Sequence, residues 1–155
     1  AYTTRVGMGP LVTEDDALDD VMELGKEYGT TTGRRRRGGW LDLVMLRYAA
    51  MVNGVREIVL TKMDVLSNLE KVKVCIAYRY RGKKLYTPPP AVHILEQCEP
   101  VYVTLRGWEE SVGFGKGAVH MSDEARAFIK CIQRYTDLKV TMISYGRERN
   151  AMLIL

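Results

Sequence analysis

A short stretch, residues 29–40, places threonines, glycines and four successive arginines just before a pattern typical of a helix. Glycine lets the backbone bend close to a ligand, and threonine hydroxyls and backbone N–H groups donate hydrogen bonds. Guanidinium groups bind carboxylate and phosphate oxygens two at a time, and the start of a helix adds partial positive charge. The stretch predicts a loop that binds a small anion with several oxygens. The alternative is a solvated basic loop or a patch for nucleic acid.

Length and composition are those of an ordinary globular protein, and 155 residues suffice for one domain with a buried core. We therefore expect a single domain over residues 1–155. The net charge of +4 arises largely from the arginine run, which favours a local anion site over a general polyanion binder. No apolar stretch approaches the roughly 18 residues that span a membrane. We expect neither nucleic acid nor a membrane as a partner.

The three cysteines, Cys75, Cys98 and Cys131, are widely separated and belong to no Cys/His cluster. This spacing supports neither a disulfide framework nor a zinc site. Cysteines of this kind are typically small core hydrophobes in a reducing compartment, so we expect a cytoplasmic location and no metal ligands among them.

Hydrophobic periodicity predicts strands and helices in a mixed order. The expected strands span residues 2–6, 57–60, 71–80, 101–105, 140–144 and 151–155, and the expected helices span residues 14–24, 40–53, 92–97 and 123–135. The glycine-rich residues 107–117 are expected to form a loop. Because the elements do not follow a strict βαβ order, the predicted fold class is α+β, a mixed sheet with packed helices. The chain opens without methionine in a strand already under way, so we expect a piece of a longer protein.

The sequence Thr-Lys-Met-Asp at residues 61–64 follows a short apolar strand, at the end where ligand loops emerge in open α/β sheets. The carboxylate of Asp64 can accept two hydrogen bonds from the ring N–H and the exocyclic amine of guanine, a pair that adenine lacks. The stem of Lys62 can lie along the purine face with its ammonium outside. These residues predict a guanine site; the alternative is a turn in which Asp64 caps residues 65–68.

A second strand end carries Ser144 and Gly146, whose hydroxyl and backbone N–H groups suit a base carbonyl; an ordinary turn is the alternative. Together with residues 29–40 and 61–64, this predicts a site for a nucleotide and a further carboxylate or phosphate ligand. The sequence contains no glycine-rich phosphate loop of the G-x-x-x-x-G-K-[ST] type and no evident acid–base pair. Groups that handle phosphate and move protons must lie elsewhere or not exist.

Several motifs then occur in a fixed order, namely TTRVG at residues 3–7, EYGTTTGRRRR at 27–37, GWLD at 39–42, LTKMDVL at 60–66, KVCIAY at 73–78, PVY at 100–102, GW at 107–108 and IS at 143–144. Over essentially all its residues the chain resembles the C-terminal portion of the adenylosuccinate synthetase family. The resemblance implies part of a larger α/β ligase that uses GTP as co-substrate and Mg²⁺ as cofactor to join L-aspartate to inosine monophosphate. In this family the 6-oxygen of the purine is phosphorylated first, and the aspartate amine then displaces the phosphate.

The resemblance also implies roles for individual residues. The aspartate-binding residues would be Thr31, Thr32, Arg34 and Arg36; the residues that bind inosine monophosphate would be Val6, Gly7 and Arg34; and the GTP-binding residues would be Arg36, Lys62, Asp64, Ser144 and Gly146. A full-length member is expected to form a homodimer.

Some features of the family are missing or changed. The N-terminal phosphate loop, with its catalytic Asp and His and the magnesium ligand, lies outside these residues, so we expect no catalytic and no metal-binding residue here and an isolated chain without activity. Arg147 stands where a proline is usual after Ser-x-Gly, which puts that wall of the guanine pocket in doubt, and Val12 replaces a proline before Thr13. The alternatives are a non-enzymatic basic module that binds nucleic acid and a degenerate GTP-binding domain.

Overall fold

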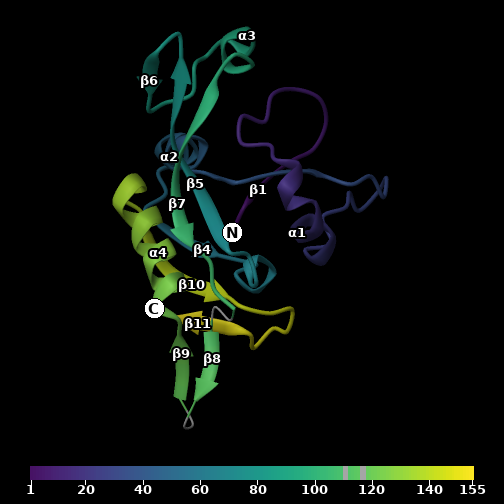
Figure 1. Ribbon diagram of the computed structural model, residues 1–155, viewed down its shortest axis with the longest axis vertical. Coiled ribbons are helices and arrows are strands. Elements are labelled where there is room, and N and C mark those ends of the chain that lie inside the picture. Colours follow the sequence, from purple (N-terminus) through teal and green to yellow (C-terminus); the bar gives the residue numbers. More distant parts are fainter. Residues whose placement is uncertain (110–111, 116–117) are drawn as a thin grey trace. The chain divides into compact units, whose positions relative to one another are not determined.

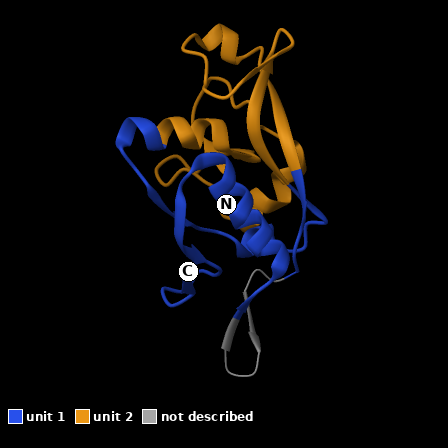
Figure 2. Cartoon of the chain, turned by 90° about the vertical axis from the view of Figure 1, so that its left-hand side faces the viewer, with its two compact units in different colours: residues 1, 50–72, 104–155 blue, residues 2–49, 73–103 orange. Residues whose placement is uncertain are grey.

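The computed structural model describes residues 1–109, 112–115 and 118–155 (Figure 1). Strands and helices are mixed along the described chain, which confirms the α+β class. Contacts divide the chain into two compact units (Figure 2): unit 1 comprises residues 1, 50–72 and 104–155, and unit 2 comprises residues 2–49 and 73–103. The single domain expected over residues 1–155 stays a prediction.

The secondary structure consists mainly of short strands. The strands are β1 (Thr3–Arg5), β2 (Arg37–Gly39), β3 (Leu41–Asp42), β4 (Glu57–Leu60), β5 (Lys71–Tyr80), β6 (Lys83–Leu85), β7 (Glu99–Arg106), β8 (Val112–Gly115), β9 (Ala118–Met121), β10 (Lys139–Ser144) and β11 (Met152–Ile154). The helices are α1 (Asp19–Leu24), α2 (Leu43–Asn53), α3 (Val92–Leu95) and α4 (Asp123–Thr136), with 3-10 turns η1 (Asp16–Leu18) and η2 (Asp64–Leu66). No helix among the described residues is long and apolar enough to cross a membrane.

Unit 2 is built on β5, which pairs in parallel with β3 and antiparallel with β6 and also pairs with β7. The alternation of Val74, Ile76 and Tyr78 along β5 predicted such a strand. Its buried residues Cys75 and Tyr78 pack with Val44 of α2 and with Leu95. The strands β1 and β2 form a separate antiparallel pair, in which the N-terminal strand lies beside the end of the arginine run.

The buried residue Asp42 forms hydrogen bonds that connect several elements of unit 2. Its Oδ1 accepts hydrogen bonds from the backbone N–H groups of Val44 at 3.0 Å and Met45 at 3.1 Å, which caps the start of α2. Its Oδ2 accepts a hydrogen bond from the hydroxyl of Tyr78, and its own N–H donates to Thr3 Oγ1 at 3.0 Å. Burial raises the pKa of the Asp42 carboxyl above its ordinary value, although these hydrogen bonds oppose the shift.

Unit 1 contains a three-stranded sheet in the order β11–β10–β4, in which β10 is antiparallel to β11 and parallel to β4. The helix α4 begins at the cap Ser122, whose Oγ accepts a hydrogen bond from Ala125 N at 3.2 Å, and it contacts β10 (Figure 1). Its apolar residues, spaced for one helical face, are buried as predicted. Trp108 packs on Phe128 of this helix, with ring centroids 5.4 Å apart.

Three expected elements differ from the structure. The helix expected from residue 40 begins at Leu43, because residues 41 and 42 pair with β5 before Asp42 caps the helix. The helix expected from residue 14 is replaced by η1 and α1, because the side chain of Asp15 caps at Ala17 N. The loop expected over residues 107–117 contains β8, and residues 110, 111, 116 and 117 lie outside the described residues.

The raised pKa of Asp42 gives a pH dependence that can be measured. A group whose pKa is higher in the folded state binds a proton more readily there, so its contribution to stability grows as pH falls through the folded pKa and is lost as pH rises through it. The Asp42→Asn variant lacks this titration. Urea unfolding from pH 7 down to about 4, the ordinary Asp value, should show wild type gaining free energy of unfolding relative to the variant on acidification. A constant difference between the two proteins across this range would contradict the raised pKa.

Candidate functional site

Residues 27–36 of unit 2 form a hairpin-like loop. Its base is closed by the hydrogen bond from Arg36 N to Glu27 O at 2.8 Å, and its middle by Gly29 N to Arg34 O at 2.8 Å. At the tip, Gly33 has a φ of +62°, a backbone conformation that favours glycine, and its N–H donates to Gly29 O at 2.8 Å. The tip residues Thr30, Thr31 and Thr32 are all exposed. The loop therefore presents a cluster of hydroxyl groups to solvent.

The four arginines at residues 34–37 differ in their surroundings. The Arg34 guanidinium is exposed and has no hydrogen-bond or ion-pair partner in the part of the chain that the structure describes. The other three pair with carboxylates: Arg35 with Asp19 at 2.8 Å, Arg36 with Glu27 at 3.1 Å and Arg37 with Glu14. The Arg37 hydrogen bond lowers the pKa of the Glu14 carboxyl below its ordinary value. Most of the positive charge in the run is thus neutralised within unit 2.

Glu27 and Arg36 form the most enclosed of these pairs. Glu27 is only 5% exposed, and its Oε1 also accepts a hydrogen bond from the hydroxyl of Tyr2 at 2.8 Å. Arg36 donates from Nη1 to Glu27 Oε2, while its Nε–H is buried without a partner among the described residues. A charge-assisted pair of this kind is about twice as strong as a neutral hydrogen bond. Glu27 therefore determines where the Arg36 guanidinium lies in this structure.

The strand pair β1–β2 brings the start of the chain beside this loop. Arg5 lies opposite Arg37 at the end of the pair, so Val6 and Gly7 continue along the segment that carries Arg36. Val6 is 74% exposed, and Gly7 has a φ of +81° with open space where a side chain would lie. The structure thus places Val6 and Gly7 after the strand pair, next to the base of the loop at Arg36.

The end of the loop is anchored by a network that the sequence did not reveal. Trp40 Nε1 donates to Asp15 Oδ2 at 2.6 Å, and Lys73 Nζ pairs with the same oxygen at 3.2 Å. The ammonium of Lys73 also lies 5.5 Å from the ring of Trp40 and 5.6 Å from the ring of Tyr102. Burial opposes ionisation of Asp15, but the hydrogen bonds from Trp40, Ala17 N and Lys73 lower its pKa overall. These contacts fix the direction in which the chain leaves the loop.

In unit 1, the parallel pairing of β4 and β10 places two of the predicted segments together (Figure 1). Strands that run in the same direction end at the same edge of a sheet, so residues 61–64 and 144–146 emerge side by side. The N–H of Met63 donates to Ser144 O at 3.1 Å. Lys62 has a φ of +59°, which is uncommon for a residue with a side chain and sets the path of this turn.

Asp64 is half-buried at the start of η2, and its carboxylate has no hydrogen-bond or ion-pair partner among the described residues. The interpretation of Asp64 as a cap for residues 65–68 is not supported, because η2 has Met63 at its cap position and no side-chain cap bond. Trp108 Nε1 donates to Met63 O at 3.2 Å and so holds the backbone just before Asp64. The carboxylate is therefore held at a strand end, and no described residue uses its acceptor oxygens.

Ser144 ends β10 and Gly146 lies in the turn to β11, which is closed by Tyr145 N donating to Ala151 O at 3.0 Å. Ser144 Oγ donates to Gly146 O at 3.1 Å. A side chain at position 146 would approach the Cβ of Ala151 to 3.0 Å, so the turn is closely packed there. Arg147, at a position where the resemblance implies a proline, is exposed within this turn.

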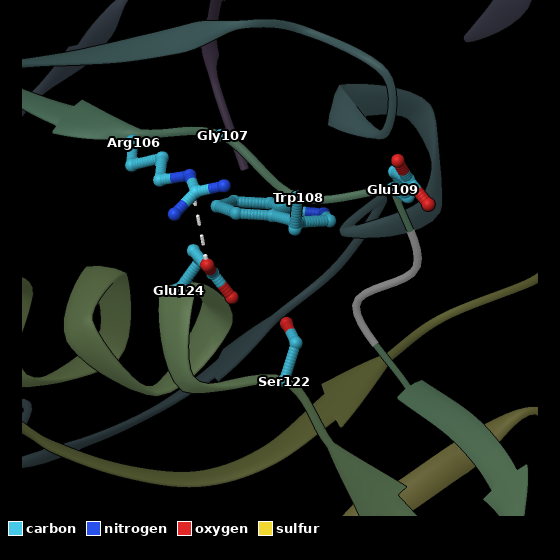
Figure 3. Close-up of a pocket in the computed structure, with 6 residues that line it drawn as sticks. All are labelled: Arg106, Gly107, Trp108, Glu109, Ser122 and Glu124. Carbon is cyan, nitrogen blue, oxygen red and sulfur yellow. Dashed lines mark ion pairs between the residues drawn. The ribbon is translucent and has the colours of Figure 1, made fainter.

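A cavity of about 280 Å³ opens beside Trp108 in unit 1 (Figure 3). Its lining consists of Arg106, Gly107, Trp108, Glu109, Ser122 and Glu124. Arg106 and Glu124 pair across it with 3.8 Å between Nε and Oε1. None of the predicted site residues lines it, so it does not belong to the predicted ligand sites.

The residues described here do not fit a magnesium site. No group of three or more His, Cys, Asp or Glu side chains within residues 1–109, 112–115 and 118–155 is arranged to hold a metal ion. Mg²⁺ prefers several oxygen ligands in octahedral geometry, and single carboxylates such as that of Asp64 do not provide them.

Sequence reasoning placed the loop, the strand-end aspartate and the serine turn, but it missed Glu27, Asp15 and Lys73. Glu27 stands at the beginning of the quoted motif at residues 27–37. The available signal for the Glu27–Arg36 pair was a carboxylate at one end of a glycine-rich loop and an arginine at the other. Asp15 and Lys73 are 58 positions apart, and no local pattern links them.

Comparison with known proteins gives a consistent result. A family model described as adenylosuccinate synthetase matches residues 1–153. An adenylosuccinate synthetase from Caldicellulosiruptor saccharolyticus is 48% identical and is matched over 99% of this chain and 37% of its own, and one from Desulfosudis oleivorans is 44% identical over 100% of this chain and 37% of its own. The structure of fully ligated adenylosuccinate synthetase from Plasmodium falciparum superposes with a TM-score of 0.89 at 37% identity, over 99% of this chain and 38% of that chain. The chain thus spans little more than a third of the length of these relatives.

The Glu27–Arg36 pair predicts a change in loop stability that can be measured without any ligand. In the Glu27→Gln variant, Arg36 loses its counter-charge; a loss of about 1 kcal/mol would make local opening roughly fivefold more frequent. Hydrogen exchange of the Gly29 and Arg36 amides should accelerate by about that factor.

Asp20→Asn serves as the matched control, because Asp20 is exposed, belongs to the same acidic segment and has no hydrogen-bond or ion-pair partner among the described residues. Loss of its charge should therefore change exchange in the loop little. Equal acceleration in both variants, or none in Glu27→Gln, would show that Glu27 does not stabilise the loop.

Proposed function

Since the chain belongs to the adenylosuccinate synthetase family, we propose that it supplies the aspartate-binding loop and the guanine pocket of a GTP-dependent ligase. The proposed reaction joins L-aspartate to inosine monophosphate and gives adenylosuccinate, GDP and phosphate, in the AMP branch of purine biosynthesis. The observation that carries the proposal is the loop at residues 27–36, in which a guanidinium without a partner among the described residues lies with exposed hydroxyls, while the neighbouring arginines are neutralised.

Aspartate would bind through Thr31, Thr32, Arg34 and Arg36. A dicarboxylate needs several donors, and guanidinium forks provide them in pairs. The Arg34 side chain pairs with no described residue, so it could receive a carboxylate directly. Arg36 is already bound to Glu27. It would therefore either bind the ligand carboxylate in addition to that of Glu27 or exchange Glu27 for the ligand. The threonine hydroxyls at the exposed tip would complete the donor set.

Inosine monophosphate would bind beside this loop through Val6, Gly7 and Arg34. The absence of a side chain at Gly7, together with the open space there, allows a ribose to approach the backbone closely. The β1–β2 pairing supports this assignment, because it holds Val6 next to the segment with Arg36.

GTP would be recognised through Lys62, Asp64, Ser144 and Gly146; the family resemblance also implies a GTP contact for Arg36. The support comes from Asp64, a carboxylate with unused acceptor oxygens beside the Ser144 turn. Two guanine N–H donors would satisfy both its oxygens. The Lys62 stem would lie along the base, and the close packing at Gly146 would keep the serine turn in place.

In this scheme, the residues of the chain bind and orient substrates. Phosphorylation of the purine 6-oxygen and displacement of that phosphate by the aspartate amine would use groups in the part of the family fold that these residues do not cover, including the magnesium ligands. The full-length protein would act as a homodimer, and the isolated chain would be inactive. Orientation alone can still contribute several kcal/mol to such a reaction.

Charge placement weighs against a nucleic-acid module. A protein that binds a polyanion exposes arginines along its surface, and binding then falls steeply with salt. Here three of the four guanidiniums in the run are already paired with carboxylates. A degenerate GTP-binding domain would retain the role of Asp64 and lose that of the arginine loop, so separate tests of the two sites distinguish these functions.

The guanine assignment is tested by Asp64→Asn in a full-length synthetase that contains these residues. An amide cannot accept both guanine donors but can donate to the 2-oxygen of xanthine. Loss of hydrogen bonds to a charged group, about 1.5–3 kcal/mol, predicts a 10- to 100-fold lower kcat/KM with GTP and improved use of xanthosine triphosphate. Asp137→Asn is the control, because Asp137 ends α4 at a φ of +57°, a conformation that asparagine tolerates. Unchanged nucleotide preference in Asp64→Asn would remove Asp64 from the pocket.

The aspartate assignment is tested by Arg36→Leu in the same protein. Loss of a guanidinium that binds a substrate carboxylate should raise the aspartate KM about tenfold or more and lower kcat, while the KM for GTP changes less. Arg35→Leu provides the comparison, because Arg35 belongs to the same run but pairs with the exposed carboxylates of Asp19 and Glu23. If both variants retained wild-type aspartate kinetics, the loop would be a solvated surface.

A further inference from the structure

Residues 71–95 contain several basic residues but no Asp or Glu. The basic residues of this stretch are Lys71, Lys73, Arg79, Arg81, Lys83 and Lys84. The first two have counter-charges, because Lys71 pairs with Glu70 at 3.6 Å and Lys73 with Asp15 at 3.2 Å. The other four are exposed, lie in the hairpin of β5 and β6, and form no ion pair with a described residue. We call these four residues the basic hairpin.

The pairing of the two strands brings these cations close together. Arg79 of β5 lies opposite Lys84 of β6, and Tyr80 lies opposite Lys83. Like charges directly opposite one another in a sheet are destabilising. Because successive residues of a strand point to opposite faces, Lys83 and Lys84 lie on different faces of the hairpin. The hairpin therefore presents positive charge on both faces.

The turn of the hairpin adds a cation at a position that disfavours it. Arg81 has a φ of +46° and Gly82 a φ of +75°, two positive values of the kind found in two-residue hairpin turns. Asn, Asp or Gly is preferred at the first of these positions, because larger side chains are strained there. The Arg81 guanidinium lies 5.2 Å from the ring centroid of Tyr80. An arginine kept in this conformation indicates that its charge has a use other than stabilising the turn.

The strand β6 also has a free edge. In the sheet order β3–β5–β6, no strand among the described residues pairs with the far side of β6 (Figure 1). An edge strand exposes N–H and C=O groups that can pair with an added strand. Lysines on an edge strand can serve only to prevent such pairing. That role does not explain Arg79, which belongs to β5, or Arg81, which lies in the turn.

We propose that the basic hairpin is a docking surface for an extended acidic segment of another protein, which adds as a strand beside β6. The backbone of this segment would pair with the N–H and C=O groups of the free edge. Successive side chains of an added strand point to alternate faces, so two consecutive carboxylates would meet Lys83 on one face and Lys84 on the other. Charge complementarity would steer the encounter and fix the register.

The free edge favours a polypeptide over a nucleic acid as the partner. A polypeptide carries the backbone N–H and C=O groups that extend a sheet, whereas a nucleic-acid strand would use only the cations, through its phosphates. The proposal depends on the charge and exposure of the basic hairpin, and not on which residues bind aspartate or guanine.

Fluorescence anisotropy with labelled peptides tests the proposal, in a full-length synthetase that contains these residues. One peptide of threonine and valine carries four consecutive glutamates at its centre. Its isomer, of the same composition, carries the glutamates at alternate positions, which lie on one face of a strand. The first peptide should bind about fivefold more tightly, because the isomer can reach only one of the two lysines. Lys84→Glu should weaken binding of the first peptide about tenfold, since a repulsion replaces an attraction.

Lys130→Glu is the matched control, because it changes the net charge equally and Lys130 is exposed in α4 without an ion-pair partner among the described residues. It should leave peptide binding unchanged. Lys84→Gln removes the charge without reversing it and should show a smaller loss. The kinetics with aspartate, inosine monophosphate and GTP should stay at wild-type values in all three variants, which verifies folding and separates this surface from the proposed substrate sites.

Three results would overturn the proposal: no binding of either peptide, equal binding of both, or unchanged binding in Lys84→Glu. A labelled oligouridylate provides the comparison with nucleic acid. If it bound more tightly than either peptide and lost that binding in Lys84→Glu, the basic hairpin would be a nucleic-acid surface and the proposal would also fail.

Discussion

Four successive guanidinium groups, at residues 34–37, must be kept stable side by side, and several acidic residues of unit 2 contribute to this. Like charges this close repel one another, so they must be neutralised or held apart. The chain meets this requirement with the acidic segment that precedes the loop: Glu14 pairs with Arg37, and Asp19 and Glu23 with Arg35. These acids are placed to favour a helix start, yet they also supply counter-charges. The same acidic segment thus supplies both the first turns of η1 and α1 and the counter-charges of the arginine run.

Local patterns predicted the long elements, and contacts distant in the sequence decided the rest. The period-2 pattern of β5 and the apolar face of α4 identify these elements directly. The helix boundary at Leu43 could not be placed in the same way, because the apolar spacing extends to Leu41. That residue pairs instead with Val74, far along the chain. Similarly, glycines suggested a loop at residues 112–115, where pairing with β9 produces a strand.

The candidate site shows the same difference between what local patterns predict and what distant contacts decide. Each segment could be found from its own residues, because an arginine loop and a strand-end aspartate carry their chemistry locally. Their assembly could not, since the proximity of residues 61–64 to Ser144 depends on the parallel pairing of β4 with β10. Two aspartates illustrate the difference. Asp42 accepts three hydrogen bonds and is buried, so its carboxylate is used by the fold. Asp64 accepts none from the described residues and lies at a strand end, so its carboxylate is available.

Under the proposed function, the unequal states of Arg34 and Arg36 bear on selectivity. A ligand with one carboxylate can bind Arg34 and leave the Glu27–Arg36 pair intact. A second carboxylate gains the interaction with Arg36 only by competing with Glu27, an acceptor that the protein already holds in place. Specificity is a difference between affinities, and an internal competitor lowers the affinity for any anion that cannot replace it well. The pair would thus favour a dicarboxylate whose geometry reaches both arginines over the many smaller anions that reach only one.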